Sequence, residues 1–148
     1  MNPMFKRVYF FLAISLVLSG PTAAWAERLS VNVEVANIRT GPDTKETVIW
    51  QVEKYHPLNV TQRQGAWCLF EDFEGDRGWI SCSLLDDTRT IIVTKEKCNV
   101  RTEPDTKADV RFTVDRGVPF KVLGEQGRWI HIVHADGDDG WIHKSLVW

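Results

Sequence analysis

Three cysteines, Cys68, Cys82 and Cys98, are the side chains of this sequence with the richest covalent chemistry. If the hairpin that follows Cys68 pairs Phe70 with Ile80, then Cys68 falls opposite Cys82 on the same face. We therefore predict a Cys68–Cys82 disulfide, subject to the Cα separation that bridging requires. The rival pairing joins Cys82 to Cys98. Otherwise Cys98 is expected to be a small buried apolar residue.

A catalytic cysteine needs a base within hydrogen-bond reach and a third group that orients this base. His131, His134 and His143 follow Cys98 in the sequence, but no activated pair is visible, so no catalytic residue is predicted. The same hairpin register places His131 opposite His143, where two imidazoles could bind Zn²⁺ or respond to pH. The simpler interpretation is two solvated histidines, and we predict no metal and no cofactor.

Four tryptophans occupy two positions that recur along the chain: Trp67 and Trp129, then Trp79 and Trp141. Alternation along a strand puts Phe70 on the face opposite to Trp67, so the tryptophans belong to an outer or rim face. An exposed indole can stack on a sugar or grip a peptide. Alternatively, each indole covers its own domain or seals a contact between domains.

The positions recur because the chain repeats itself. Shifted by 62 residues, the sequence aligns with itself without a gap from Leu29 to Val147. The segment 37–45 (Asn-Ile-Arg-Thr-Gly-Pro-Asp-Thr-Lys) aligns with 99–107 (Asn-Val-Arg-Thr-Glu-Pro-Asp-Thr-Lys). This period suits one small domain, so the chain contains two copies of one module. A feature of both copies then indicates the fold, and a feature of one copy can indicate function.

Two aromatic residues and two arginines complete the candidate ligand-binding residues. Trp50 and Tyr55 occur in the first copy alone, which predicts a more aromatic groove there. Arg39 and Arg101 recur beside a turn rich in Asp and Thr. A guanidinium there could hold a ligand carboxylate bidentately, or it could brace the turn by pairing with a nearby acidic side chain. The full candidate set is Trp50, Tyr55, Trp67, Trp79, Trp129, Trp141, Arg39 and Arg101.

Short β-rich runs separated by turn residues predict an all-β fold. In the first copy we expect strands at 29–35, 48–52, 58–62, 67–71 and 77–81, with a turn at 40–44. Strands this short can curl into a small barrel, which removes the exposed edges of the sheet. The predicted domains are residues 29–85 and 91–147, joined by a linker at 86–90.

The first 26 residues have the pattern of a secretory signal peptide. Lys6 and Arg7 precede an apolar run, and Ala24-Trp25-Ala26 offers a cleavage site. An uncleaved membrane anchor is the alternative. Cleavage removes two cations and leaves 16 Lys plus Arg against 20 Asp plus Glu, a net charge of −4. This acidity argues against nucleic acid or an anionic membrane as a partner.

The motif Asn-Val-Arg-Thr-x-Pro-Asp at 99–105, followed by Trp129, Gly140-Trp141-Ile142 and Ser145-Leu146, resembles the signature of the bacterial SH3-like (SH3b) domain. The first copy matches through residues 37–42, Trp67 and 78–80. The resemblance covers nearly all of the chain after the signal peptide. It implies two tandem SH3-like β-barrels in an exported bacterial protein, periplasmic or secreted.

In that family, such domains commonly attach to the cell wall or to other proteins, often beside a catalytic domain. No catalytic domain is recognised in this sequence, so we expect a non-enzymatic module. Its expected ligand is peptidoglycan peptide or glycan. The alternative is an adaptor that binds a peptide of an envelope protein through the grooves of its barrels. The sequence does not indicate an oligomeric state.

Overall fold

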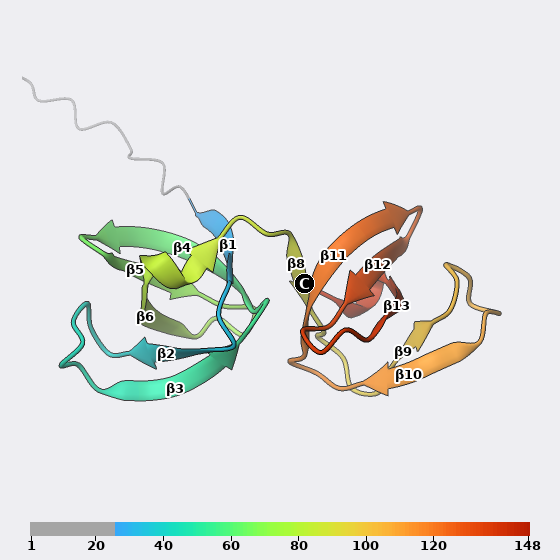
Figure 1. Cartoon of the computed structure of the whole chain (residues 1–148), viewed down its shortest axis with the longest axis horizontal. Coiled ribbons are helices and arrows are strands. Elements are labelled where there is room, and N and C mark those ends of the chain that lie inside the picture. Colours follow the sequence, from blue (N-terminus) through green and yellow to red (C-terminus); the bar gives the residue numbers. More distant parts are fainter. Residues whose placement is uncertain (1–25) are drawn as a thin grey trace, which may run out of the picture.

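A computed structural model describes residues 26–148 (Figure 1). The predicted signal peptide lies outside the described residues except for Ala26. The described part of the chain is all-β, as predicted, with two short 3-10 helices, η1 and η2. Within residues 26–148, no helix is both long and apolar enough to cross a lipid bilayer.

Each copy forms one unit, called the first and the second repeat below. The first repeat contains β1 (Glu27–Val31), β2 (Val35–Arg39), β3 (Val48–Glu53), β4 (Pro57–Gln64), β5 (Trp67–Glu71), β6 (Arg77–Ser81), η1 (Cys82–Leu84) and β7 (Leu85–Asp86). The second repeat contains β8 (Thr90–Ile92), β9 (Cys98–Arg101), β10 (Val110–Val114), β11 (Pro119–Gln126), β12 (Trp129–Val133), β13 (Asp139–His143) and η2 (Lys144–Leu146). The 62-residue shift carries β4, β5 and β6 onto β11, β12 and β13, so the two repeats share one fold.

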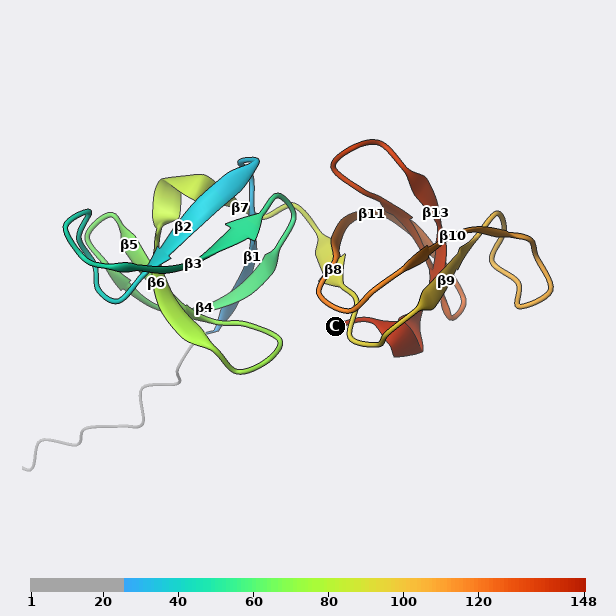
Figure 2. The ribbon, with the colours of Figure 1, turned by 90° about the horizontal axis from the view of Figure 1, so that it is seen from below.

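The strands of each repeat form one antiparallel sheet. The order is β3-β2-β6-β5-β4-β1-β7 in the first repeat and β10-β9-β13-β12-β11-β8 in the second. Both sheets curl around their own cores (Figure 2). Among residues 26–148, no ladder joins the two edge strands of either sheet, so the predicted barrel closure is not seen. In the first repeat the edge strand β7 has two residues, which is too short to continue the ladder.

Alternation along the central strands separates the core from the outer face. Phe70 and Ile80 are fully buried in the first repeat, as are Ile132 and Ile142 in the second. Burying each such side chain contributes about 1.5–3 kcal/mol to folding. The recurrent tryptophans lie on the other face and are half-buried. These four apolar side chains therefore face inward, as their strand positions predict.

The register of the β5–β6 hairpin differs from the prediction. Phe70 pairs with Gly78, and Cys68 pairs with Ile80, two residues away from the expected register. The turn closes earlier because the Asp72 N–H donates to the Asp76 carbonyl. A shift of two residues leaves every side chain on its expected face. The faces were therefore predicted correctly, although the register was not.

The two repeats lie side by side, with the C-terminus between them (Figures 1 and 2). The predicted linker at 86–90 is shortened in the structure, because β7 ends at Asp86 and β8 begins at Thr90. Arg116 of the second repeat donates to Glu74 of the first at 2.7 Å, and its guanidinium lies 5.2 Å from the centre of the Phe73 ring. Side chains of the two repeats therefore contact each other directly.

Candidate ligand-binding site

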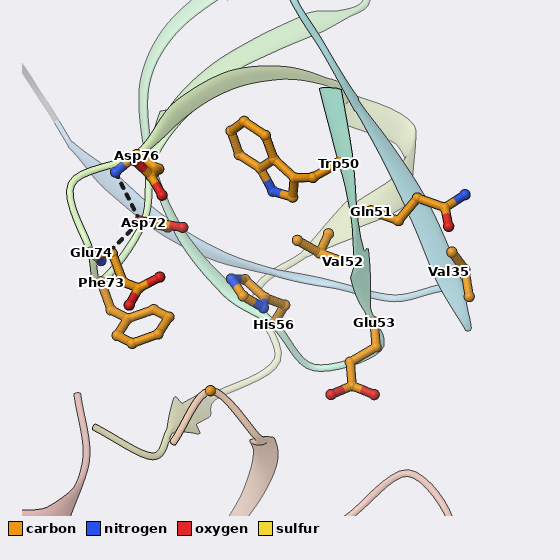
Figure 3. Close-up of a pocket in the computed structure, with 11 residues that line it drawn as sticks. Val35, Trp50, Gln51, Val52, Glu53, His56, Asp72, Phe73, Glu74 and Asp76 are labelled. Atoms are coloured by element: carbon orange, nitrogen blue, oxygen red, sulfur yellow. Dashed lines mark hydrogen bonds between the residues drawn. The ribbon is translucent and has the colours of Figure 1, made fainter. Parts of the chain in front are cut away.

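A pocket of about 670 Å³ opens in the first repeat, beside the second repeat (Figure 3). The β5–β6 loop forms one side, and Val35 together with Trp50, Val52 and other residues of β3 forms the other. His56 lies between these sides, and Gly117 of the second repeat also lines the pocket. The volume is in the range of small-molecule binding sites.

Trp50 forms an aromatic wall of this pocket. Its ring meets Phe70 edge to face, with centroids 6.3 Å apart and planes at 85°. Gly78 makes room for this packing, since a Cβ added there would lie 2.3 Å from Ile38 Cγ2 and 3.2 Å from Trp50 Cη2. The indole is half-buried and packs against the core. Trp50 thus combines a structural contact with a surface available to a ligand.

The pocket is acidic. Glu53, Asp72, Glu74 and Asp76 line it, and it has no lysine or arginine among its lining residues. Asp72 Oδ1 accepts the N–H groups of Glu74 and Asp76 at 2.9 and 3.0 Å and so fixes the loop. Glu74 is paired with Arg116. Within residues 26–148, the carboxylates of Glu53 and Asp76 accept no hydrogen bond and form no ion pair.

His56 lines the pocket beside Phe73, with ring centroids 6.3 Å apart. Its side chain is 9% exposed. Burial lowers the pKa of His56 to about 4, although the charge of Glu74 acts in the opposite direction. The imidazole is therefore neutral at physiological pH. Its Nε2 atom is buried without a hydrogen-bond partner in the described part of the chain.

A second, smaller pocket of about 310 Å³ opens in the second repeat and has the opposite charge. Lys95, Lys97 and Arg101 line it together with Trp129, and Glu96 is its one acidic residue. His143 also lines this pocket and meets Trp129 edge to face at 5.3 Å. The structure thus brings together two predicted residues, Trp129 and Arg101, in a basic groove.

Five predicted residues line neither pocket: Arg39, Tyr55, Trp67, Trp79 and Trp141. Arg39 Nη1 donates to the Glu46 carbonyl at 2.8 Å, and Arg101 Nη1 donates to the equivalent Ala108 carbonyl at 2.7 Å. Both guanidiniums brace their turns through a backbone carbonyl, whereas the sequence suggested an acidic side chain. Tyr55 lies in the β3–β4 turn with φ 71°.

The outer-face tryptophans pack against their neighbours across the strands. Trp79 pairs with Leu69, and Trp67 pairs with Ser81. In the second repeat, Trp141 stacks on His131 with centroids 4.9 Å apart. The residues that face the tryptophans across the strands differ between the repeats, whereas the tryptophans themselves occur in both.

A disulfide joins Cys68 and Cys82, whose Cα atoms lie 5.3 Å apart. The bond joins diagonal positions of the two segments, because the residue directly opposite Cys68 is Ile80, two residues before Cys82. The rival pairing of Cys82 with Cys98 is absent from the structure. Cys98 is buried, and its thiol donates to the Lys95 carbonyl at 3.2 Å. Burial raises the pKa of the Cys98 thiol, which favours the unreactive form.

The histidine pair of the second repeat is not formed. His131 faces Trp141, and His143 faces Trp129, so the predicted juxtaposition is wrong by the same two-residue shift. His131 Nε2 instead lies 2.9 Å from Asp139 Oδ2, and this hydrogen bond lowers the pKa of Asp139. No group of three His, Cys, Asp or Glu side chains suited to a metal ion occurs within residues 26–148.

Sequence reasoning missed most of the first pocket. His56, Phe73 and Asp72 were not singled out, although the second repeat has a different residue at each position: Val118, Ala135 and His134. A comparison of the repeats position by position was the signal that could have found them. Trp50 was identified by that comparison.

The model of the bacterial SH3 domain matches residues 32–87 and again residues 94–148. The chain belongs to the bacterial SH3 domain family. Both repeats are bacterial SH3 domains, which confirms the resemblance seen in the motifs.

Curated relatives are longer proteins. The chain is 26% identical over 157 residues to the provisionally named N-acetylmuramoyl-L-alanine amidase YrvJ of Bacillus subtilis (strain 168), covering 97% of this chain and 30% of YrvJ. It is 32% identical over 65 residues to the provisionally named cell wall amidase LytH of Staphylococcus epidermidis, covering 41% of this chain and 22% of LytH. The chain thus spans less than a third of either relative.

Among solved structures, an NlpC/P60 family protein from Bacillus cereus ATCC 10987 is similar with a TM-score of 0.40 and 15% identity. The match covers 82% of this chain and 56% of that chain. NlpC1 from Trichomonas vaginalis has a TM-score of 0.37 and 13% identity, covering 90% of this chain and 50% of that chain. These similarities are too low to support an inference about function.

Proposed function

We propose that this protein is an exported, non-enzymatic module that binds peptidoglycan, in the periplasm or outside the cell. The observation that carries the proposal is the first-repeat pocket, with Trp50 and Phe73 as aromatic surfaces beside hydrogen-bonding groups. Aromatic rings suit both the faces of sugars and the aliphatic parts of a peptide. The pocket is open at the surface, as binding to a polymer requires, since the lining residues Glu53, Glu74 and Asp76 are exposed.

The comparisons support a cell-wall ligand. Relatives that share these domains are named for amidases of the cell wall, and the shared part is the bacterial SH3 region. In those longer proteins we expect the SH3 domains to bind the cell wall while another part cleaves it. This chain would bind the cell wall through its two repeats.

Co-sedimentation with purified sacculi tests the proposal. We expect the mature protein to pellet with sacculi and the Trp50→Ala variant to bind at least tenfold more weakly, because a ring at the centre of a binding site commonly contributes more than 1.4 kcal/mol. Phe112→Ala is the matched control, because Phe112 occupies the equivalent position in the second repeat and packs partly against its core. This control should bind as well as the unmodified protein.

The adaptor hypothesis gives a different result. Protein that remains in the supernatant with sacculi, while crosslinking in whole cells gives one discrete protein adduct, would contradict wall binding and favour a partner protein. Thermal unfolding of both variants shows whether a loss of binding reflects a loss of fold. A Trp50→Ala variant that no longer folds would assign Trp50 to the core, and Trp50→Phe would then be the informative substitution.

A further inference from the structure

We propose that the first-repeat pocket receives a primary ammonium group of the ligand, between the carboxylates of Asp72 and Asp76 and beside the ring of Trp50 (Figure 3). This inference rests on the proposed function for its source of the amine, since the diamino acid of a peptidoglycan stem peptide carries one. The pocket chemistry itself comes from the charges and rings that line it.

Negative charge in this pocket is only partly compensated within the protein. Glu74 is paired with Arg116, whereas Glu53 and Asp76 have no hydrogen-bond or ion-pair partner within residues 26–148. The Oδ1 atom of Asp72 accepts backbone N–H groups, and no bond to its Oδ2 atom occurs in the same residues. Oxygen atoms beside aromatic rings can accept a cation and stabilise it further through its contact with the ring faces.

Arg116 shows that the rim already holds a cation in this way. Its guanidinium donates to Glu74 Oε1 at 2.7 Å and lies 5.2 Å from the centre of the Phe73 ring. One acidic residue and one aromatic ring of the β5–β6 loop thus bind a positive group at the mouth of the pocket. Deeper in the pocket, Asp72 and Trp50 offer the same two kinds of group.

His56 supplies an independent sign of a ligand. It is 9% exposed and lines the pocket, and its Nε2 atom is buried without a partner in the described part of the chain. A buried polar atom without a hydrogen bond destabilises the folded state, so native proteins rarely keep one without a reason. A neutral imidazole can accept a hydrogen bond from an amine and does not repel its charge.

The second repeat lacks this arrangement at the equivalent positions. His134 and Asp136 replace Asp72 and Glu74, and they lie 2.8 Å apart. His134 also packs edge to face on Phe120, with centroids 5.4 Å apart. Asp136 is therefore engaged by a histidine of the same loop, and this histidine stands where the first repeat has Asp72. Recognition of an amine is expected in the first repeat alone.

Chemical acetylation of sacculi tests the inference with the mature protein. Acetic anhydride converts free amines to uncharged amides and leaves the glycan chains in place. We expect untreated sacculi to retain the protein and acetylated sacculi to retain at least tenfold less. Equal retention on both would overturn the ammonium site and leave the proposed function intact. Failure to bind untreated sacculi would overturn the proposed function instead.

A soluble probe decides the inference in either case. Calorimetric titration uses N-acetyl-L-alanyl-γ-D-glutamyl-L-lysine and the same tripeptide with its lysine amine acetylated. We expect only the free amine to bind. Absence of binding by both probes, or equal binding of both, would overturn the inference.

Two charge-removing variants locate the site. Asp76→Asn changes an exposed side chain, and Asp72→Asn keeps an oxygen that can accept the loop N–H groups. Each should weaken binding of the free-amine tripeptide at least tenfold, since each variant removes a charge-assisted hydrogen bond to the ammonium group. Asp138→Asn is the matched control on the second repeat and should bind normally. Normal binding by both Asp76→Asn and Asp72→Asn would overturn the assignment.

Discussion

The two repeats share one backbone fold. They differ in the position of the pocket that opens on each repeat and in the sign of the charge that lines it. The first repeat has an acidic, aromatic pocket between β3 and the β5–β6 loop, and the second has a basic groove lined by Lys95, Lys97 and Trp129. Val33 and Val35 stand where the second repeat has the two lysines. Duplication therefore preserved the fold, while the surfaces diverged by substitutions at a few positions.

Shared features of the repeats serve the fold. Arg39 and Arg101 make the same hydrogen bond across the same turn. Gly78 and Gly140 make room for the same apolar neighbour, since an added Cβ would lie 2.3 Å from Ile38 and 2.6 Å from Val100. Features that occur once, such as the disulfide and His56, are the ones that distinguish the repeats in stability and binding.

The disulfide gives the largest expected difference between the repeats. It closes a loop of about 15 residues in the first repeat, which corresponds to about 3 kcal/mol of stability in the chain-entropy model. The second repeat has Ile130 and Lys144 at the equivalent positions. We expect the Cys68→Ala/Cys82→Ser variant to lose about this amount in the first repeat alone.

Urea unfolding gives the total loss, and hydrogen exchange read by mass spectrometry assigns it to a repeat. Faster exchange confined to β5 and β6, with β12 and β13 unchanged, is the expected pattern. Unchanged protection of the first repeat in the variant would contradict the prediction.

His56 should make the stability of the first repeat depend on pH. Burial holds its pKa at about 4 in the folded state, below the usual value of 6.5, so the unfolded chain binds the extra proton first. The stabilisation is complete above pH 6.5 and is lost as the pH falls toward 4. Between pH 7 and pH 5 the loss is about 2 kcal/mol.

The variant His56→Val, which places the residue of the second repeat at this position, should remove that part of the pH dependence. Glu74 is the charge that acts on the imidazole; Glu53, Asp72 and Asp76 line the same pocket, and Arg116 of the second repeat pairs with Glu74. They remain in the variant, so their own contributions cancel when the two proteins are compared. Urea unfolding at pH 7 and pH 5 gives the free energy of unfolding of both proteins. If this free energy falls between pH 7 and pH 5 by the same amount in the variant, His56 is ruled out as the source of the pH dependence.

The positions of the strands were predictable because the sequence pattern of each copy indicates them independently. Alternation placed Phe70 inward and Trp67 outward, and this held although the hairpin register was wrong by two residues. For the same reason the cysteine pairing was found, since Cys68 and Cys82 keep a common face under a shift of two. What failed was the predicted strand at 29–35, because the chain turns at 32–34 and leaves Val35 58% exposed at the start of β2.

Most of the first pocket could not be predicted from one copy's sequence. It joins residues of β3, of the β3–β4 turn and of the β5–β6 loop, and the curvature of the sheet decides how closely these approach. His56 gave no signal of its own, because a single histidine between turn residues has no periodicity. Phe73 lies beside it, and the position of Phe73 depends on the loop geometry that the register prediction missed.

The smallest expected effect concerns the contact through which the repeats meet. Arg116 bridges them, donating to Glu74 in the first repeat and, at 2.8 Å, to the Thr94 carbonyl in its own. Arg116→Lys keeps the charge but loses the planar fork that reaches both acceptors. Because the pair is exposed, we expect stability to fall by less than about 1 kcal/mol.

The orientation of the repeats should respond more than their stability does. A contact between the repeats remains after the substitution. The guanidinium carbon of Arg28 lies 3.8 Å from the centre of the Trp148 ring. Residual dipolar couplings should then report a looser relative orientation in Arg116→Lys, with amide shifts at Phe73 and Glu74. An unchanged orientation in the variant would show that the short connection and Arg28 are enough to hold the two repeats in place. In that case the rim of the acidic pocket would keep its shape without a cation at Glu74, because the β5–β6 loop is already fixed by Asp72.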